Sequence, residues 1–236
     1  MPAAALRLPG HPDAVPLDVV LLDVNETLSD TAPVAAALEE VGVPGHLATA
    51  WFAGVLRDGF ARTAAGAAAP FADVARGGLR AVLEGVVDDV DAAADRVLDA
   101  FLHLPAHADV APGLAALHAL GPRVATLSNG AAEVAGALLE RAGAREHVDL
   151  LLSVEDAPGG AWKPAAAAYA HGLAAAGAAP DHALLVAVHP WDVDGAARAG
   201  LRTAWVDRAG RTYPDHLLAP DLTVPSLTAL AERLGA

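Results

Sequence analysis

The chain has 236 residues, of which 54% are hydrophobic, and this is enough for one large α/β domain with a modest insertion. It contains no cysteine, so disulfides, thiolate metal ligands and a cysteine nucleophile are excluded. The formal net charge of −14 argues against nucleic acid or an anionic membrane as a partner, because phosphate binding relies on clustered Lys and Arg. An anionic substrate would need a local positive site within a repelling overall field.

The first residues, 1–16, contain one arginine, several prolines and no apolar run of the kind that a secretory signal carries. We therefore expect a frayed terminus there. No stretch of the chain approaches the roughly 18 uninterrupted apolar residues that a membrane helix needs. The sequence predicts a soluble, cytoplasmic protein.

The first predicted element is a buried strand over residues 17–24, LDVVLLDV. An all-helical stretch follows, with four helical patterns between residues 31 and 109 and no convincing strand. The patterns lie at 34–42, 46–66, 71–86 and 90–104. Residues 104–113, rich in Pro, Ala and Gly, are predicted to be the linker that returns the chain to the sheet.

From about residue 110 onward, apolar runs typical of buried parallel strands alternate with helical patterns. The predicted strands lie at 123–129, 148–155, 182–189, 201–207 and 221–226. Alternation of this kind predicts an α/β fold with right-handed crossovers, a Rossmann-like doubly wound parallel sheet. We expect residues 1–30 and 110–236 to form this core, and residues 31–109 to form a helical cap inserted after the first strand.

Polar side chains follow the predicted strands at their carboxyl ends, which is where open α/β sheets bind ligands. In chain order these residues are Asp23, Asn25, Thr27, Ser128, Asn129, Lys163, His189, Trp191 and Asp192. One acid, a hydroxyl–amide pair, a lysine and a second acid are therefore expected to converge on one edge of the sheet.

A carboxylate at the end of a buried strand costs several kcal/mol unless it is paired. Lys163 is the obvious partner for Asp23, and it would keep that carboxylate ionised and oriented. An ionised carboxylate in a dry pocket is a usable nucleophile, because covalent catalysis splits a difficult displacement into two easier steps.

The ordered set resembles the haloacid dehalogenase superfamily, and in detail its type II 2-haloacid dehalogenase branch. The resemblance rests on DVNETL for the aspartate loop, LSNG for the second motif, KPAAAAY for the lysine motif and HPWD for the fourth. It covers nearly the whole chain, including the position of the cap. It implies a hydrolase that acts on a small anionic organic acid, with no cofactor.

Four residues carry the catalytic roles that the resemblance implies. Asp23 would attack C2 of a 2-haloacid, displace halide and form an ester, while Thr27 and Lys163 hold its carboxylate. Water, positioned with help from Asp192, would then attack the ester and release a 2-hydroxy acid.

The resemblance also implies residues that bind the substrate. Ser128, with nearby backbone amides, would hold the substrate carboxylate, and Asn129 would face the leaving halide. Trp191 would form a wall of the pocket, and Tyr169 would support the lysine. Helical caps of this kind often pair, which makes a homodimer an expectation as well.

A metal ion is not expected. Phosphatases of the superfamily place an acid two residues after the nucleophile, where this chain has Asn25, which cannot act as a general acid. Their fourth motif supplies an acid for Mg²⁺, whereas Ala187, Val188 and His189 stand here and only Asp192 remains. Mg²⁺ prefers a near-octahedral shell of oxygens, which these residues supply poorly.

Asn25 and His189 complete the expected substrate-binding set, but both depart from the dehalogenase pattern. An aromatic residue usually occupies the first position and an amide the second. Phe52 stands where dehalogenases carry an arginine that cradles the halide, and Arg57 or Arg62 are candidates to replace it.

These departures leave other functions open. Relatives on this scaffold also hydrolyse C–N bonds in strained small-ring amino acids, for which polar Asn25 and titratable His189 would be suitable. A non-catalytic small-molecule-binding relative is an alternative of another class, and a Mg²⁺-dependent phosphatase is a distant one.

Overall fold

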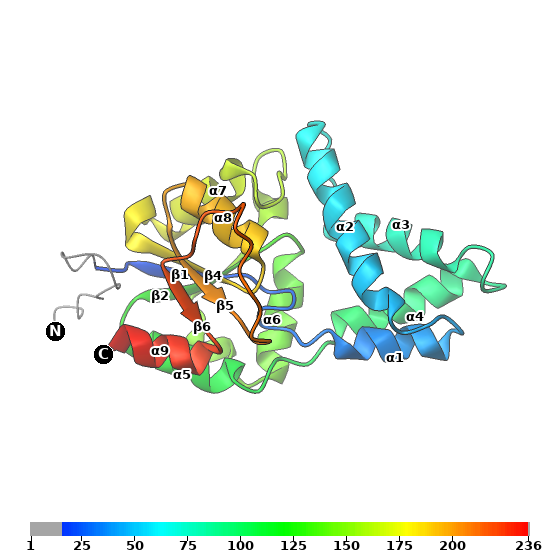
Figure 1. Ribbon diagram of the computed structural model, residues 1–236, viewed down its shortest axis with the longest axis horizontal. Coiled ribbons are helices and arrows are strands. Elements are labelled where there is room, and N and C mark those ends of the chain that lie inside the picture. Colours follow the sequence, from blue (N-terminus) through cyan, green and yellow to red (C-terminus); the bar gives the residue numbers. More distant parts are fainter. Residues whose placement is uncertain (1–15, 236) are drawn as a thin grey trace.

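The computed structural model describes residues 16–235, and its centre is a six-stranded, wholly parallel sheet (Figure 1). The strands are β1 (Val19–Leu22), β2 (Arg123–Ser128), β3 (Leu150–Ser153), β4 (Ala183–Ala187), β5 (Arg202–Val206) and β6 (Leu222–Val224). Their order is β3-β2-β1-β4-β5-β6, which confirms the predicted doubly wound α/β fold and all six predicted strands. The frayed terminus predicted for residues 1–16 falls, except for its last residue, outside the described residues.

The sheet is apolar on both faces, because alternate residues of each strand point to opposite sides. In β1, Val19 and Leu21 belong to one apolar cluster, Val20 and Leu22 to the other, and none of the four is exposed. The second cluster lies beneath the helices α5 (Val110–Ala119), α6 (Ala132–Arg141) and α9 (Leu227–Gly235). The other face is covered by α7 (Ala166–Ala176) and α8 (Pro190–Arg198) (Figure 1).

Between β1 and α5 the chain forms four helices that stand beside the sheet (Figure 1). They are α1 (Ala32–Glu40), α2 (Leu47–Ala64), α3 (Phe71–Leu83) and α4 (Val90–Leu102). Short 3₁₀ turns elsewhere are η1 (Arg145–His147), η2 (Val154–Asp156) and η3 (Pro180–His182). The four helices coincide with the four predicted patterns, and we keep residues 31–109 as the proposed extent of the cap.

Apolar side chains at helical spacing hold the cap together. Leu79 and Leu83 of α3 pack with Trp51 and Val55 of α2 in one buried cluster, and the Trp51 indole N–H donates to the Ala75 carbonyl at 3.1 Å. The cap is therefore a packed unit and not a loose excursion from the sheet.

The two segments that connect cap and core run side by side. Ser29 and Ala106 form an antiparallel bridge, the Asp30 N–H donates to Pro105 O at 2.8 Å, and the His107 N–H donates to Leu28 O at 2.9 Å. The return linker is shorter than the predicted 104–113, because α5 already begins at Val110. Pro112 does not prevent this start, since the first turn of a helix needs no N–H donor from it.

A second set of contacts joins the cap to the core loop that follows β3. The Trp162 indole N–H donates to Ala69 O at 2.9 Å, and the Glu155 carboxylate accepts from the Phe71 N–H at 2.8 Å. Gly59 of α2 is required here, since a Cβ at that position would lie about 2.1 Å from the Trp162 ring. The cap is thus attached to the core by the two connecting segments and also by the loop that follows β3.

Candidate active site

Asp23 follows directly after β1 and begins a tightly bonded loop. Its N–H donates to Val186 O of β4 at 3.0 Å, and the N–H groups of Leu28 and Ser29 both donate to Val24 O. Glu26 adopts a left-handed backbone with φ of 62°, which is uncommon for a residue other than glycine and persists only where surrounding contacts enforce it. The loop fixes where the Asp23 carboxylate lies.

Lys163 lies between two carboxylates. Its Nζ is 2.8 Å from Asp23 Oδ1 and 2.7 Å from Asp192 Oδ2. Lys163 and Asp192 are completely buried and Asp23 is 5% exposed. These three residues, here called the ion cluster, come from three separate segments of the chain, and Lys163 is the only lysine in the sequence.

The ion cluster shifts the pKa of each member. Burial alone would raise the pKa of Asp23, but the Lys163 charge, the neighbouring His189 and hydrogen bonds from Lys163 and Thr27 lower it below its usual value. Burial raises the pKa of Asp192, and the nearby Asp23 charge adds to this against the opposing effect of Lys163. Burial would lower the pKa of Lys163, but the two carboxylates raise it. Asp23 is therefore the more acidic of the two carboxyl groups.

The remaining carboxylate oxygens are also bonded. The Thr27 hydroxyl donates to Asp23 Oδ2 at 2.7 Å, and its oxygen accepts from the Val188 N–H. The Tyr169 hydroxyl donates to Asp192 Oδ1 at 2.7 Å. All four carboxylate oxygens of the ion cluster thus have a hydrogen-bond partner within the protein.

These contacts bear on two expected roles. Tyr169 has no exposed surface and bonds Asp192, so it is placed to support Lys163 through that carboxylate. Gly195 of α8 makes this contact possible, because a Cβ there would lie about 2.6 Å from the Tyr169 hydroxyl. Asp192 has no exposed surface and holds Lys163, and its predicted part in positioning water stays a prediction.

Ser128 and Asn129 separate at the end of β2. Ser128 lines a cavity, and its oxygen accepts from the Gly130 N–H at 2.9 Å, which leaves its own hydrogen free to donate. The Asn129 side chain instead holds the Lys163 backbone, since its Oδ1 accepts from the Lys163 N–H at 2.8 Å and its Nδ2 lies 3.4 Å from the Lys163 carbonyl oxygen. Asn129 therefore helps to place Lys163, and its predicted contact with a halide stays a prediction.

The first turn of α6 follows these residues and lacks a side-chain cap. Its N-cap is Ala131, which has no acceptor, so the first N–H groups of the helix remain without a side-chain partner. Gly130 and Ala131 line the same cavity as Ser128. Free N–H groups at a helix N-terminus attract anions, and they supply the local positive potential that the acidic chain otherwise lacks.

His189 and Trp191 form an aromatic stack with two side chains of α2. The His189 ring lies 5.1 Å from Trp191 and 6.4 Å from Phe52, and Phe60 meets Trp191 edge-on at 4.9 Å. His189 Nε2 is 3.9 Å from Asp23 Oδ2. Trp191, which was predicted to form a wall of the pocket, thus lies in a contact between cap and core, next to His189.

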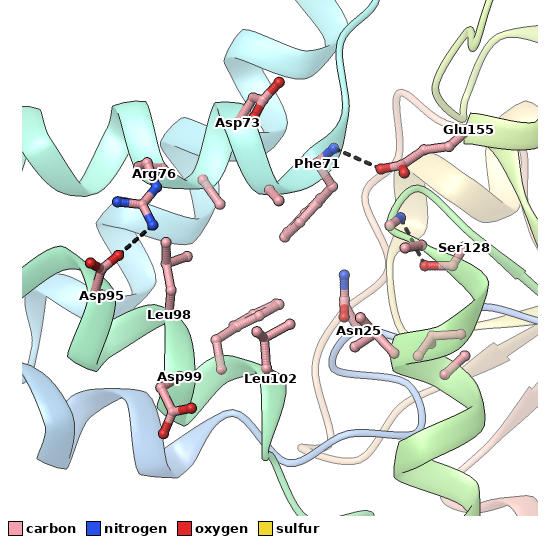
Figure 2. Close-up of a pocket in the computed structure, with 18 residues that line it drawn as sticks. Asn25, Phe71, Asp73, Arg76, Asp95, Leu98, Asp99, Leu102, Ser128 and Glu155 are labelled. Atoms are coloured by element: carbon pink, nitrogen blue, oxygen red, sulfur yellow. Dashed lines mark hydrogen bonds and ion pairs between the residues drawn. The ribbon is translucent and has the colours of Figure 1, made fainter.

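A cavity of about 360 Å³ opens between the cap and the carboxyl ends of β1 and β2 (Figure 2). On the core side it is lined by Asn25, Ser128 and Glu155, with Val24 beside them. On the cap side its lining is mainly apolar. The cap residues are Phe71, Ala72, Asp73, Ala75, Arg76, Asp95, Leu98, Asp99, Phe101 and Leu102.

Neither predicted substitute for the missing arginine lines this cavity. Arg57 is exposed and pairs with its neighbour Asp58, and Arg62 lines a separate depression on the cap. Arg76 of α3 is the arginine that lines the cavity, and its guanidinium pairs with Asp95 of α4 (Figure 2). Its position depends on the packing of the cap helices, which no motif in the sequence indicates.

A further network behind the nucleophile loop also escaped sequence reasoning. Arg208, after β5, donates to the Thr27 carbonyl and to Asp109, each at 2.8 Å. The other oxygen of Asp109 accepts from the Leu227 N–H at the start of α9. Arg208 therefore connects the loop after β1, through Asp109, to the first residues of α5 and α9.

The comparisons with known proteins agree with this geometry. The model of the haloacid dehalogenase-like hydrolases matches residues 17–200, a span that includes the whole ion cluster. The chain belongs to this family. The protein is therefore a hydrolase, as the members of this family are.

Individual members of the family match over most of their length. The chain is 29% identical to haloacetate dehalogenase H-2 of Moraxella sp. (strain B), over 93% of this chain and 98% of that one. It is 30% identical to (S)-2-haloacid dehalogenase 1 of Pseudomonas sp. (strain CBS-3), over 81% and 82%. The L-2-haloacid dehalogenase of Xanthobacter autotrophicus with chloropropionic acid covalently bound superposes with a TM-score of 0.83 and 27% identity, over 92% and 97% of the two chains.

Two further observations concern classes considered from the sequence. Within residues 16–235 no group of three or more His, Asp or Glu side chains is arranged to hold a metal ion. In the same part of the chain no helix has the length and apolar character required to cross a bilayer.

Proposed function

We propose that this hydrolase is a 2-haloacid dehalogenase that forms an aspartyl ester on Asp23. The observation that carries the proposal is the ion cluster, in which a buried, ionised carboxylate is held by Lys163 and Thr27 without an acid at residue 25. It is supported by the relatives named above, one of which holds chloropropionic acid covalently. A strained-ring C–N hydrolase and a phosphatase have no comparable support.

In the first half-reaction an oxygen of Asp23 attacks C2 from the side opposite the halogen. A C–O bond forms as the carbon–halogen bond breaks, and the halide leaves with the bonding electrons. No proton needs to be donated to a halide, which agrees with Asn25 at the position of a general acid. Ser128 and the free N–H groups of α6 hold the substrate carboxylate in this arrangement.

In the second half-reaction water attacks the carbonyl carbon of the ester at Asp23. The bond between that carbon and the former Asp23 oxygen now attached to C2 breaks, and the 2-hydroxy acid leaves. One proton is released as the carboxylate is restored. Lys163 stabilises the charge on the ester oxygen, while Asp192, Tyr169 and Asn129 keep Lys163 in place.

The direct test is halide release from 2-chloropropionate, with the protein in EDTA. We expect chloride and lactate in equal amounts and no loss of rate with EDTA. Ring opening of a small cyclic amino acid without halide release would instead favour the C–N hydrolase, and EDTA-sensitive phosphate release from an aryl ester would favour the phosphatase.

The ester is tested by a single turnover in ¹⁸O-labelled water with enzyme in excess. We expect the label in the Asp23 carboxylate, located by mass spectrometry of its peptide, and not in the product. Label that enters the product in this first turnover would mean that water attacks the substrate directly.

Two further expectations, on the cellular compartment and the oligomeric state, complete the proposal. We propose that the protein acts in the cytoplasm and forms a homodimer through the cap. Sedimentation equilibrium across a range of concentrations tests the second point, and a single species at the monomer mass of 23.7 kDa would exclude it.

A further inference from the structure

The cap side of the cavity contains a group of apolar side chains, here called the apolar end, with charged side chains around it, and the opposite side is called the core end (Figure 2). Asn25 and Ser128 lie at the core end, and the proposed function places Ser128 at the substrate carboxylate. Across from them Phe71, Leu98, Phe101 and Leu102 of the cap face the same space. We call these four cap side chains, together with Val134 of α6, the tail wall.

The volume is far larger than a two-carbon haloacid needs. One water occupies about 30 Å³ in the liquid, so a cavity of about 360 Å³ has room for roughly a dozen groups of that size. A substrate that filled only the core end would leave the tail wall in contact with water. A substrate chain that covered this apolar surface would gain about 25 cal/mol of binding free energy for each Å² removed from water.

The charges around the apolar end exclude a second carboxylate on the substrate. Arg76 is paired with Asp95, and Asp73 and Asp99 add two further carboxylates at the exposed rim (Figure 2). Glu155 also faces the cavity, but its oxygen accepts from the Phe71 N–H. An anionic tail would meet net negative charge, whereas an uncharged hydrocarbon tail would meet the tail wall.

We propose that the preferred substrates are 2-haloalkanoic monocarboxylates with an apolar chain of about four to eight carbons, whose tails lie against the tail wall. This inference rests on the proposed function and specifies its substrate class. The carboxylate and C2 occupy the core end, and the tail determines how tightly each acid is bound.

The test is a series of racemic 2-bromo acids, from bromoacetate through 2-bromopropionate, 2-bromobutyrate and 2-bromohexanoate to 2-bromooctanoate, with bromide release as the readout. We expect kcat/KM to rise by about fourfold for each added methylene that becomes buried, until the tail wall is filled. We expect 2-bromosuccinate, which is similar in length to 2-bromobutyrate but carries a second carboxylate, to be a poor substrate.

Variants locate the effect. Leu98→Trp fills the apolar end, so the ratio of kcat/KM for 2-bromohexanoate to that for bromoacetate should fall at least about tenfold. Leu98→Ala removes volume from the same wall and should move the optimum to a longer acid. Val86→Trp is the matched control, because Val86 is an exposed cap residue outside the cavity, and it should leave the ratio unchanged. Circular dichroism of each variant verifies that it is folded.

The outcomes separate the two proposals. Turnover of bromoacetate and 2-bromopropionate with kcat/KM that falls steadily for longer acids would overturn this inference and leave the proposed function intact. Equal ratios for Leu98→Trp and Val86→Trp would also overturn it. No bromide from any acid would overturn the proposed function, and this inference with it.

Discussion

The carboxyl edge of the sheet and the cap-facing cavity lie next to each other but are built on opposite principles. At the edge, Asp23, Lys163 and Asp192 are buried and every carboxylate oxygen has a partner. In the cavity the cap contributes mainly apolar side chains, and its charged groups lie toward the rim.

The difference separates the reaction from the choice of substrate. Fixed charges in a site without water act strongly on a developing transition state and lose much if one partner is misplaced. Apolar walls contribute in proportion to the area they cover and tolerate changes of shape. Substitutions at the edge should therefore alter rate and stability sharply, and substitutions in the cavity should alter preference by graded amounts.

The largest effect is expected from Asp23→Asn. Loss of the nucleophile should reduce kcat for halide release at least about 1,000-fold. Stability should fall as well, because the ionised Asp23 carboxylate, whose pKa is lowered, stabilises the folded state at neutral pH, and Lys163 loses one of its two partners. Halide assays and thermal unfolding measure the two effects, and an unchanged melting temperature would contradict a stabilising role of Asp23 in the ion cluster.

Lys163→Met should affect both rate and stability. It leaves two buried carboxylates without a cation, and breaking a buried ion pair in this way costs about 3–5 kcal/mol of unfolding free energy. Urea unfolding at pH 7 measures the loss. Arg57→Met is the matched control, since it removes a cation from an exposed pair and should change nothing measurable. Equal midpoints for the two variants would mean that the ion cluster does not stabilise the fold.

Thr27→Val should move the acid limb of the halide-releasing step. The Asp23 pKa is lowered in the folded protein, so this carboxylate stays ionised until the pH falls below its usual range near 3.8. Removing the Thr27 hydroxyl takes away a hydrogen bond to the ionised form, which should raise the Asp23 pKa. Single-turnover halide bursts between pH 3 and 6, on the scale of ordinary carboxyl pKa values, should lose amplitude or rate at a higher pH in the variant.

The rise of the Asp23 pKa in Thr27→Val should also lower the stability of the folded protein at acid pH. A carboxylate with a lowered pKa stabilises the folded state above its unfolded pKa, and that contribution disappears as the pH falls through the folded value. Thr27→Val should therefore lose its stability at a higher pH than the wild type in acid titrations followed by circular dichroism. An unchanged acid midpoint would show that Thr27 does not control the ionisation of Asp23.

Tyr169→Phe should give the smallest change. It removes one of the two hydrogen bonds that orient the Asp192 carboxylate, and we expect kcat to fall about tenfold with little change in KM. Tyr213→Phe is the matched control, because the only other tyrosine donates to the Pro190 carbonyl and touches none of the ion cluster. A rise in KM without a fall in kcat would return Tyr169 to the substrate-binding role predicted from the sequence.

Much of the fold could be predicted from the sequence, because the signals are local. Continuous apolar runs mark strands that are buried on both faces, and 3.6-residue spacing marks the four cap helices. The edge that carries the site could be predicted too, since Asp23, Ser128 and Lys163 all follow strands whose carboxyl ends must meet.

The roles of individual side chains were harder to predict because they depend on contacts between distant segments. Asn129 was expected at the halide, but it holds the backbone of Lys163, 34 residues away. Arg76 belongs to no recognisable motif, and only the packing of α3 against α4 brings it to the cavity. Which of several polar residues at an edge faces a cavity, and which faces a neighbouring loop, is determined by packing and not by spacing.

A practical consequence follows from the presence of a single lysine. Protein grown with ¹⁵N-lysine carries one labelled ammonium, and it is the one between Asp23 and Asp192. Its magnetic resonance signal is free of overlap, and burial slows the exchange of its protons with solvent. The spectrum of the unmodified enzyme can therefore follow, in real time, how the charge beside Asp23 changes during the proposed formation and hydrolysis of the ester.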